Sequence, residues 1–340
     1  MTTKIHRILI VGVGSIGERH VRCFLATTRA VIGICEIQDA LRESVTKRYG
    51  IEEVFSDLEK AFAASWDAVL IATPAHTHIP IALQAASRGL NLLIEKPLST
   101  SLEGIAELQQ AVNSQHLLAA VSYNHRAHPG LRAMKTAVDS GKFGKPLQLY
   151  AVTGQHFPAY RPAYRDIYFA DHAKGGGAVQ DSITHALNLG EWLAGPIERI
   201  TVDAAHQLLE GVTVEDTVHA LTRQGSVMGN YTVNLYQQPN ESTTTLVCEK
   251  GTLRFELHKG RFLWMDTVDG VWHEESHVLP DRDTWYILNA TAFLDALEEK
   301  ADPLCSLEEG IQTLRVNLAA LVSMESQQWQ QIKGDDNAGS

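Results

Sequence analysis

The chain has 340 residues, a formal net charge of −11 and four cysteines scattered along its length. This length suits two domains that each bury a core of their own. An acidic chain without a basic cluster is a poor partner for nucleic acid and for anionic membranes, and no apolar stretch approaches the length of a membrane span. The N-terminus is polar and then strand-like, and the cysteines lack a CxxC spacing, so we expect a soluble cytoplasmic protein with buried, reduced thiols.

A strand, a glycine-rich turn and a helix open the chain. The apolar run at residues 8–11 predicts a buried strand, and residues 15–25 predict a helix. The turn between them has the Gly-x-Gly-x-x-Gly spacing, which suits a tight turn, a close approach of pyrophosphate to the backbone and close packing of helix on strand. We expect a dinucleotide pyrophosphate to bind at the positive end of the helix dipole, against Gly12, Gly14, Ser15, Ile16 and Gly17.

An acidic residue ends the second predicted strand, at residues 30–35. Glu36 follows Gly17 by nineteen residues. A carboxylate at this place accepts both ribose hydroxyls of an adenosine and repels a 2′-phosphate. We therefore predict NAD rather than NADP as the cofactor; the alternative is a glycine-rich turn without a ligand, beside a solvated Glu36.

Strand-like and helical segments alternate up to about residue 122. The further strands are expected at 67–72, 90–94 and 117–121, and the helices at about 39–49, 78–88 and 101–114. This alternation predicts right-handed crossovers and a doubly wound parallel sheet. The first domain, residues 1–122, is therefore an α/β domain that binds NAD.

The pattern changes after Ser122. Helices are expected near 129–140, 177–194, 284–299 and 308–332, and strands at 146–156, 197–206, 214–222, 227–235, 243–248, 252–257 and 262–266. Because no long helix separates the last six strands, antiparallel pairing is the economical arrangement. We predict an α+β domain with one large, mostly antiparallel sheet over residues 123–332, followed by a flexible tail at 333–340.

Fifteen histidines raise the question of a metal site. The closest pairs, His76 with His78 and His125 with His128, lack the HExxH pattern and have no carboxylate or cysteine at a ligand spacing. We expect no metal.

Two charged pairs are candidates for chemistry. Glu95 and Lys96 follow the strand at 90–94, and ligands of open α/β sheets bind beyond such strand ends; the spacing alone leaves a surface loop equally open. Asp181 and His185 lie one helical turn apart, so Asp181 can hydrogen-bond an imidazole that takes a proton from an alcohol. The alternative for this pair is a capping Asp with a packed core His.

Together these motifs resemble the glucose–fructose oxidoreductase, inositol dehydrogenase and rhizopine catabolism family. The resemblance covers about residues 1–332 and rests on Gly12, Gly14 and Gly17, Ala72-Thr73-Pro74 with His78, Glu95-Lys96-Pro97, Tyr123-Asn124-His125-Arg126 with His128-Pro129, and Gly175 to His185. It implies a Rossmann domain, then a sheet domain whose open face builds homodimers or homotetramers. The catalytic set that it implies maps onto Lys96, Asp181 and His185. Beyond the glycine turn and Glu36, we expect cofactor contacts from Thr73, Pro74, His78, Glu95, Lys96 and Asn124.

Two positions depart from the family's pattern: Gln180, where members commonly have an aliphatic residue, and Asn188, where they have Asp. Both put the identity of the substrate in doubt rather than the use of the cofactor. The segment at 156–166 combines aromatic and guanidinium groups, as a sugar or an anionic ligand requires, although an ordinary surface loop is equally open. The expected substrate contacts are Arg126, His156, Tyr160, Arg161, Tyr164, Arg165, Asp181 and His185.

We predict an NAD-dependent oxidoreductase that takes a hydride from a secondary alcohol of a sugar, cyclitol or related polyol. His185 takes the hydroxyl proton, Asp181 orients His185, and Lys96 stabilises the charge that develops on the same oxygen; an exchange of roles between Lys96 and His185 stays open. A first alternative is an NAD-dependent glycoside hydrolase that oxidises its substrate transiently, eliminates a glycosidic group and returns the hydride. A second is a non-catalytic NAD-sensing regulator, against which the intact catalytic set argues.

Overall fold

The computed structural model describes residues 4–268 and 270–332, so the predicted tail at 333–340 lies outside it. The chain divides into two compact units. Unit 1 runs to Ala127 and includes Leu279–Ile311, and unit 2 contains His128–Val278 and resumes at Gln312. The sequence predicted one boundary, after residue 122, and therefore placed the segment 279–311 in the wrong unit.

This segment belongs to unit 1 because its helix completes the core there. In α9 (Arg282–Leu297), Phe293 and Leu294 are buried in the same apolar cluster as Phe24 of α1 (Ser15–Ala26). The rings of Phe24 and Phe293 meet edge to face, with centroids 6.3 Å apart. Hydrophobic periodicity identifies a helix but does not tell which core the helix covers.

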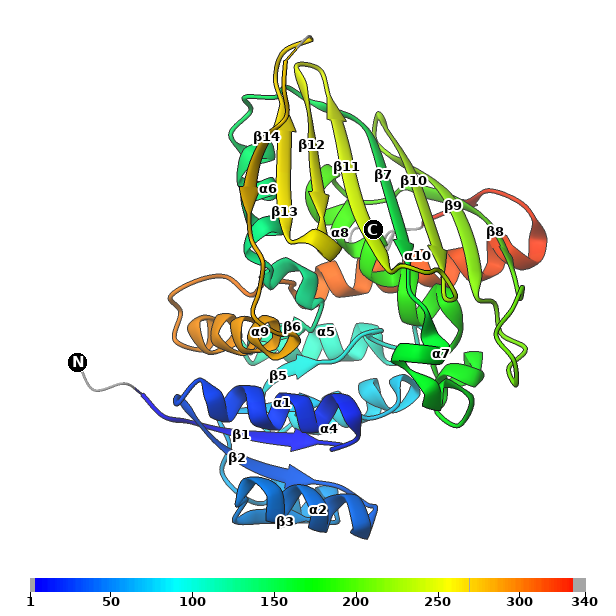
Figure 1. Ribbon diagram of the computed structural model, residues 1–340. Helices are drawn as coiled ribbons and strands as arrows, with labels where there is room; N and C mark the ends of the chain where they lie inside the picture. The colour runs from blue at the N-terminus through cyan, green and yellow to red at the C-terminus, as the bar shows by residue number, and fades with distance from the viewer. Residues whose placement is uncertain (1–3, 269, 333–340) are drawn as a thin grey trace, which may run out of the picture. The chain divides into compact units, whose positions relative to one another are not determined.

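Unit 1 is built on six parallel strands in the order β3-β2-β1-β4-β5-β6 (Figure 1). These strands are β1 (His6–Val11), β2 (Ala30–Cys35), β3 (Glu53–Phe55), β4 (Ala68–Ile71), β5 (Asn91–Ile94) and β6 (Ala119–Val121). Their apolar runs are continuous because helices cover both faces of such a sheet. The order confirms the predicted doubly wound domain.

The helices of unit 1 lie between the strands, as the alternating pattern predicted. Besides α1 and α9 they are α2 (Asp39–Tyr49), α3 (Leu58–Phe62), η1 (Ala75–Thr77), α4 (His78–Ala86), α5 (Ile105–Ser114) and η2 (Asn124–Ala127). The sequence did not predict β3 and α3, because elements of three and five residues are too short to show a period.

The carboxyl ends of five strands meet along one edge of this sheet. Val11 lies opposite both Cys35 and Ile71, Ile71 lies opposite Ile94, and Ile94 lies opposite Val121. The glycine turn, Glu36, Thr73, Lys96 and Asn124 follow these ends directly or closely. One edge of one sheet therefore carries the segments that the sequence predicted for the cofactor.

Unit 2 is built on nine strands in the order β14-β13-β12-β11-β7-β10-β9-β8-β15. Only β7 and β10 pair in parallel among the strands described, so the sheet is mostly antiparallel, as predicted. The strands are β7 (Pro146–Gly154), β8 (Arg199–Ala205), β9 (Thr217–Gln224), β10 (Val227–Asn234), β11 (Glu241–Cys248), β12 (Gly251–Glu256), β13 (Arg261–Met265), β14 (His273–Ser276) and β15 (Gln330–Gln331). The unpredicted edge strand β14 is exposed at all four residues, so it lacks an apolar alternation.

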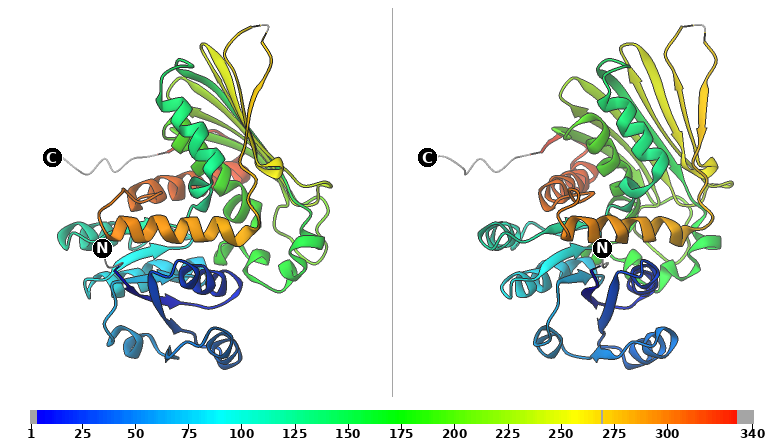
Figure 2. Two further views of the ribbon diagram at one scale, coloured as in Figure 1. Left: turned by 60° about the vertical axis from the view of Figure 1, so that its left-hand side comes forward. Right: turned by 90° about the vertical axis from the view of Figure 1, so that its left-hand side faces the viewer.

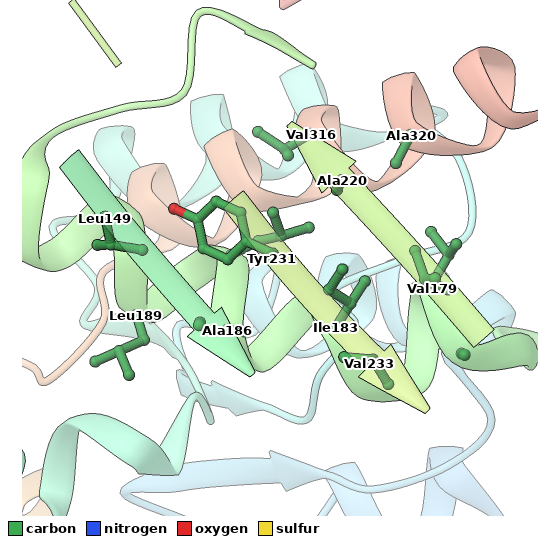
Figure 3. Close-up of a cluster of buried hydrophobic side chains, with 14 of the residues drawn as sticks. Leu149, Val179, Ile183, Ala186, Leu189, Ala220, Tyr231, Val233, Val316 and Ala320 are labelled. Carbon is green, nitrogen blue, oxygen red and sulfur yellow. The ribbon is translucent and has the colours of Figure 1, made fainter. Parts of the chain in front are cut away.

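Helices α6, α8 and α10 lie on one face of this sheet (Figure 2) and supply its core. The helical elements of unit 2 are α6 (Pro129–Asp139), α7 (Phe157–Tyr160), η3 (Pro162–Arg165), η4 (Tyr168–Ala170), η5 (His172–Lys174), η6 (Val179–Ile183), α8 (Thr184–Ala194), η7 (Leu257–Lys259) and α10 (Leu307–Ser326), whose first turn counts with unit 1. Figure 3 shows how the apolar side chains of η6 and α8 meet those of the strands and of α10, among them Leu149, Val179, Ile183, Ala186, Leu189, Ala220, Tyr231, Val233, Val316 and Ala320.

Two helices differ from the prediction. The helix expected from Gly177 to Ala194 contains a π-helical turn, η6, before α8 begins. The last helix ends at Ser326 rather than near 332, because Gln327 has a left-handed backbone with φ of 55° and Gln330–Gln331 then pair with β8. Within the described residues, no helix combines the length and apolar character that crossing a bilayer requires.

Candidate active site

The glycine turn of unit 1 has the shape that a dinucleotide needs. Gly12 has φ of 84°, and a Cβ there would come within 2.9 Å of the Ala72 carbonyl oxygen. A Cβ on Gly17 would lie 1.9 Å from the Gly12 carbonyl oxygen, so close packing excludes any side chain. Above Gly14 no protein atom lies within 4 Å of the Cβ position. The turn is thus crowded against the protein at two glycines and open at the third, which leaves room for a pyrophosphate.

The start of α1 offers donors toward this open space. The helix begins at Ser15, and no side chain caps its first N–H groups, which include those of Ser15 and Ile16. Twelve residues of aligned peptide dipoles make this end favourable for an anion. The residues present therefore fit the phosphates of a dinucleotide.

Glu36 stands beside the turn at the end of β2. Its side chain is buried, and its two oxygens accept the backbone N–H groups of Val13 and Gln38, each at 2.9 Å. A carboxylate oxygen accepts more than one hydrogen bond, so this anchoring leaves capacity for ribose hydroxyls. The arrangement fixes the carboxylate next to the predicted phosphate site.

The segment after β4 contains Thr73, Pro74 and His78. The ring nitrogens of His78 lie 2.8 Å from the Thr73 carbonyl oxygen and 3.1 Å from the Pro97 carbonyl oxygen. Burial lowers the pKa of His78, although the hydrogen bond to Thr73 opposes this shift. Both ring nitrogens face backbone oxygens, so His78 braces the neighbouring backbone, and its predicted cofactor contact stays a prediction.

Lys96 is half-buried in a turn after β5, and its bond to Pro97 is a cis peptide. The buried Glu95 carboxylate accepts from His20 Nε2 at 2.6 Å and from the Lys96 backbone N–H at 3.1 Å. Burial alone would raise the pKa of Glu95, but the hydrogen bond and charge of His20, the charge of Lys96 and a Ser122 hydrogen bond hold it below its ordinary value. Glu95 therefore braces the Lys96 turn from inside, and its predicted cofactor contact stays a prediction.

The other two predicted catalytic residues lie in unit 2. Asp181 falls within the π-helical turn η6, and His185 is the second residue of α8 and is half-buried. One Asp181 oxygen accepts from Arg161 Nη1 at 2.5 Å, and the other accepts from the Tyr168 hydroxyl at 2.7 Å. The α-helical spacing on which the predicted contact of Asp181 with His185 rested does not apply across a π turn, and that contact stays a prediction.

A second ion pair holds the start of η6. His172 Nε2 lies 2.5 Å from one Glu215 oxygen, and the other oxygen accepts the Val179 N–H at 2.8 Å. The hydrogen bond to Glu215 raises the pKa of His172. Gly177, with φ of 81°, lies so close to this pair that a Cβ would meet Glu215 at 2.5 Å. At Gly177, glycine is thus required both by the lack of space for a side chain and by the left-handed backbone conformation.

The two departures from the family's pattern have internal partners. Gln180 is buried and donates to the carbonyl oxygens of His172 and Gly176 at 2.9 and 3.3 Å. Asn188 is also buried and donates to Thr313 Oγ1 at 2.9 Å. Both side chains thus form hydrogen bonds with neighbouring backbone or with a neighbouring helix.

Four residues predicted to contact substrate have partners within the protein. Arg126 is buried in unit 1, where it donates to the Leu304 carbonyl oxygen and to Glu309. Tyr164 is 1% exposed and packs among Phe157 and Phe169. The Arg161 guanidinium is bound to Asp181, and His156 Nδ1 accepts the Ala159 N–H. The sequence did not foresee these internal partners, and the substrate contacts of the four residues stay a prediction.

Two residues of the same segment remain accessible. Tyr160 is 63% exposed. Arg165 is exposed as well, donates to the Tyr164 hydroxyl at 3.1 Å and lies 3.6 Å from Glu210. Within the described residues, no group of three or more His, Cys, Asp or Glu side chains is arranged to hold a metal ion.

Two successive stretches of the chain match one family. Residues 6–123 match the model of an oxidoreductase family with an NAD-binding Rossmann fold, and residues 131–254 match the GFO/IDH/MocA C-terminal domain. The chain belongs to the Gfo/Idh/MocA oxidoreductase family. This membership confirms the predicted family and identifies residues 6–123 as its NAD-binding domain.

Curated relatives and solved structures agree with this membership. The chain is 30% identical over 195 residues to inositol 2-dehydrogenase of Burkholderia cenocepacia (strain HI2424), covering 56% of this chain and 54% of that relative. It is 27% identical over 275 residues to inositol 2-dehydrogenase of Corynebacterium glutamicum (strain R), covering 78% of this chain and 77% of that relative. The match thus spans about half the length of the Burkholderia relative.

Among solved structures, a levoglucosan dehydrogenase in complex with NADH and levoglucosan is similar to the chain with a TM-score of 0.88 and 20% identity. The similarity covers 97% of this chain and 100% of the other. At this identity the likeness confirms the Gfo/Idh/MocA fold of both units and leaves the substrate open.

Sequence reasoning missed four residues that hold the candidate site: His20, Tyr168, His172 and Glu215. His20 lies three residues after Gly17, on the helix that the glycine motif predicted. A buried polar residue on the inner face of that helix was a signal that could have been followed. The other three belong to no motif, and their partners are far away in sequence.

Proposed function

We propose that the chain is an NAD-dependent dehydrogenase that oxidises a secondary alcohol of an uncharged sugar, cyclitol or related polyol. The observation that carries the proposal is the shared sheet edge of unit 1. It combines an open glycine turn, an anchored carboxylate for the ribose and Lys96 at the end of a nearby strand. The inositol and levoglucosan dehydrogenases among its relatives support this class of reaction.

When bound, NAD would supply the hydride acceptor. Ser15 and Ile16 would donate backbone N–H groups to its pyrophosphate, and Glu36 would accept hydrogen bonds from its adenosine ribose hydroxyls. Thr73, Pro74, Lys96 and Asn124 remain the proposed contacts along the same edge. Lys96 stabilises the developing alkoxide oxygen while His185 removes the hydroxyl proton, with Asp181 fixing the polar surroundings of His185.

An uncharged substrate fits the cations of unit 2 better than the anionic one that the sequence left open. Arg161 already forms an ion pair with Asp181, which is 2% exposed. Arg165 lies beside Glu210 and is widely exposed. Both guanidinium groups thus already lie beside a carboxylate of the protein. The hydroxyl groups of an uncharged polyol do not need a positive charge to bind, whereas a carboxylate or phosphate of a ligand does.

A panel of sugars, cyclitols, sugar acids and glycosides with NAD tests this proposal. Accumulation of NADH with a neutral polyol supports it. Cleavage of a glycoside without net NADH would favour the glycoside hydrolase, and binding of NAD with neither reaction would favour the regulator. A clear preference for a sugar acid would refute the uncharged class.

We also propose that the chain forms homodimers or homotetramers through the face of the nine-stranded sheet opposite α6 and α8. Leu221 of β9 and Met228 of β10 are 48% and 52% exposed on neighbouring strands. Exposed apolar residues on an open sheet face favour association. We expect Met228→Lys to lower the mass measured by light scattering, with the exposed Glu103→Gln in unit 1 as the control. The cytoplasmic location stays a prediction.

A further inference from the structure

A buried pair of His20 and Glu95 lies against the Lys96 turn. His20 on α1 is fully buried, and its Nε2 donates to Glu95 Oε1 at 2.6 Å, because a carboxylate only accepts. The His20 ring also meets Tyr286 of α9 edge to face, with centroids 5.7 Å apart. His20 has no role in the proposed hydride transfer. Removing a histidine and a carboxylate from water costs free energy of desolvation, so we expect such a pair to have a role beyond packing.

Glu95 connects this pair to the catalytic turn. Its second oxygen accepts the Lys96 backbone N–H at 3.1 Å, and Ser122 at the end of β6 also hydrogen-bonds the carboxylate. Asn289 of α9 donates to the Ser122 hydroxyl at 3.3 Å. One carboxylate therefore joins α1, the end of β5 and the end of β6 at the point where Lys96 emerges.

Another buried histidine, His78, lies on the far side of the same turn. Its Nδ1 lies 3.1 Å from the Pro97 carbonyl oxygen and its Nε2 lies 2.8 Å from the Thr73 carbonyl oxygen, and the neutral ring donates to one of them. The Lys96-Pro97 turn is thus held before the lysine by Glu95 and after the proline by His78. A side chain that stabilises charge on a substrate needs such fixed support, since a displacement of about 1 Å can lower a rate by ~10²-fold.

We propose that His20 is a positioning residue for Lys96, acting through Glu95, and that it ties the catalytic lysine to the helix whose start binds the cofactor. The inference rests on the proposed function in that Lys96 is the catalytic amine. His20 itself touches neither the cofactor nor the substrate in this assignment. Its role is to keep Glu95 ionised and fixed beneath the turn.

The charged and polar groups around Glu95 determine how substitutions there alter the charge beside Lys96. The groups that face it are His20 from α1, His78 from α4, Lys96 from the turn and Ser122 from β6. The ionised Glu95 favours the ammonium form of Lys96 by Coulomb attraction. Without His20, burial would favour the neutral acid of Glu95, so His20→Phe and Glu95→Gln should both remove the same negative charge.

A double-mutant cycle on kcat tests the connection. We expect His20→Phe and Glu95→Gln each to lower kcat by ~10-fold to ~10²-fold, with the NADH dissociation constant from fluorescence titration little changed. The double variant should be no slower than the worse single variant, because both changes act through one carboxylate. Cys23→Ala, on the same buried face of α1, and Glu103→Gln, an exposed carboxylate, are the matched controls.

A second measurement does not depend on turnover. The pH dependence of Lys96 acylation, followed by peptide mass spectrometry, should move to lower pH in His20→Phe and in Glu95→Gln by similar amounts, and no further in the double variant. Both controls should keep the wild-type profile. Unchanged profiles, or losses in kcat that multiply in the double variant, would overturn the proposal. Shifted profiles in a protein that oxidises no polyol would sustain the positioning role and refute the proposed function.

Discussion

The two halves of the proposed catalytic set are held by different kinds of structure. Lys96 stands between regular elements and is supported by His20 of α1 and His78 of α4. Asp181 is held by Arg161 and Tyr168, which come from a run of short helical turns before η6. Regular elements at a sheet edge preserve one geometry, whereas irregular segments accept new side chains without disturbing a core. Under the proposed function, this difference places the fixed geometry of Lys96 in unit 1 and the more changeable surroundings of Asp181 in unit 2.

Removing either catalytic group should have the largest effect. We expect Lys96→Met and His185→Phe each to lower kcat by at least ~10²-fold, because positioned acid–base and charge-stabilising groups contribute on this scale. The NADH dissociation constant, measured by fluorescence titration, should stay near the wild-type value. Near-normal turnover in either variant would show that this residue is not catalytic. The unit that contains the residue would then contribute no acid–base group to the proposed reaction.

Breaking the support of Asp181 should come next. Arg161→Met leaves the carboxylate of Asp181 buried without its counter-charge, so we expect a loss of about 3 kcal/mol in the free energy of unfolding and a fall in kcat/KM. Adding Asp181→Asn should restore much of the stability without restoring turnover. Arg165→Met, four residues away and exposed, is the control and should stay within about 0.5 kcal/mol of the wild type in urea titrations. Equal effects of the two Arg variants would contradict the assignment.

Cofactor choice should respond more moderately. Glu36→Gln keeps the shape of the side chain but removes the charge that favours ribose hydroxyls over a 2′-phosphate. We expect the dissociation constant for NAD to rise ~10-fold, which corresponds to the loss of one or two hydrogen bonds. The difference between the NAD and NADP affinities, measured by calorimetry, should become smaller. Asp39→Asn, an exposed carboxylate at the start of α2, should leave both affinities unchanged. A wild type that prefers NADP would show that Glu36 does not bind the ribose.

The smallest expected effect is a pH dependence in unit 2. Glu215 raises the pKa of His172, with Asp171 and Glu325 adding to this shift and burial opposing it. The stabilisation is therefore complete below the unfolded value of about 6.5 and is lost as the pH rises through the folded pKa. The ring is 40% exposed, so water screens the pair and we expect less than about 1 kcal/mol.

Thermal unfolding of the wild type and His172→Gln at pH 5.5 and pH 8.5 measures this effect, with His219→Gln on the exposed side of β9 as the control. The difference between wild type and His172→Gln should be larger at the lower pH. An equal difference at both values would mean that the imidazole charge contributes nothing to holding η6.

The sequence predicted the fold around the cofactor half of the proposed site because its signals are local. The spacing of Gly12, Gly14, Gly17 and Glu36 indicates one strand, turn and helix, and the parallel sheet then brings Lys96 to the same edge. The sequence revealed less of the substrate half. It predicted that Arg161 and Tyr164 contact the ligand but not that Arg161 neutralises Asp181 or that Tyr164 packs in the core. Composition shows which groups a loop contains, and only the fold shows which of them the protein itself uses.

The return of α9 to unit 1 has a consequence for synthesis of the protein. Phe293 and Leu294 complete the core around Phe24, yet they leave the ribosome after the whole continuous stretch 128–278 of unit 2. The N-terminal sheet therefore waits, with part of its apolar surface uncovered, while the second unit has all the chain it needs for its eight longer strands. Neither unit is therefore complete until the last helices of the chain have been made, because unit 1 needs α9 and unit 2 needs α10. A nascent chain stopped before α9 would carry an exposed apolar surface on its N-terminal sheet that a chaperone recognises.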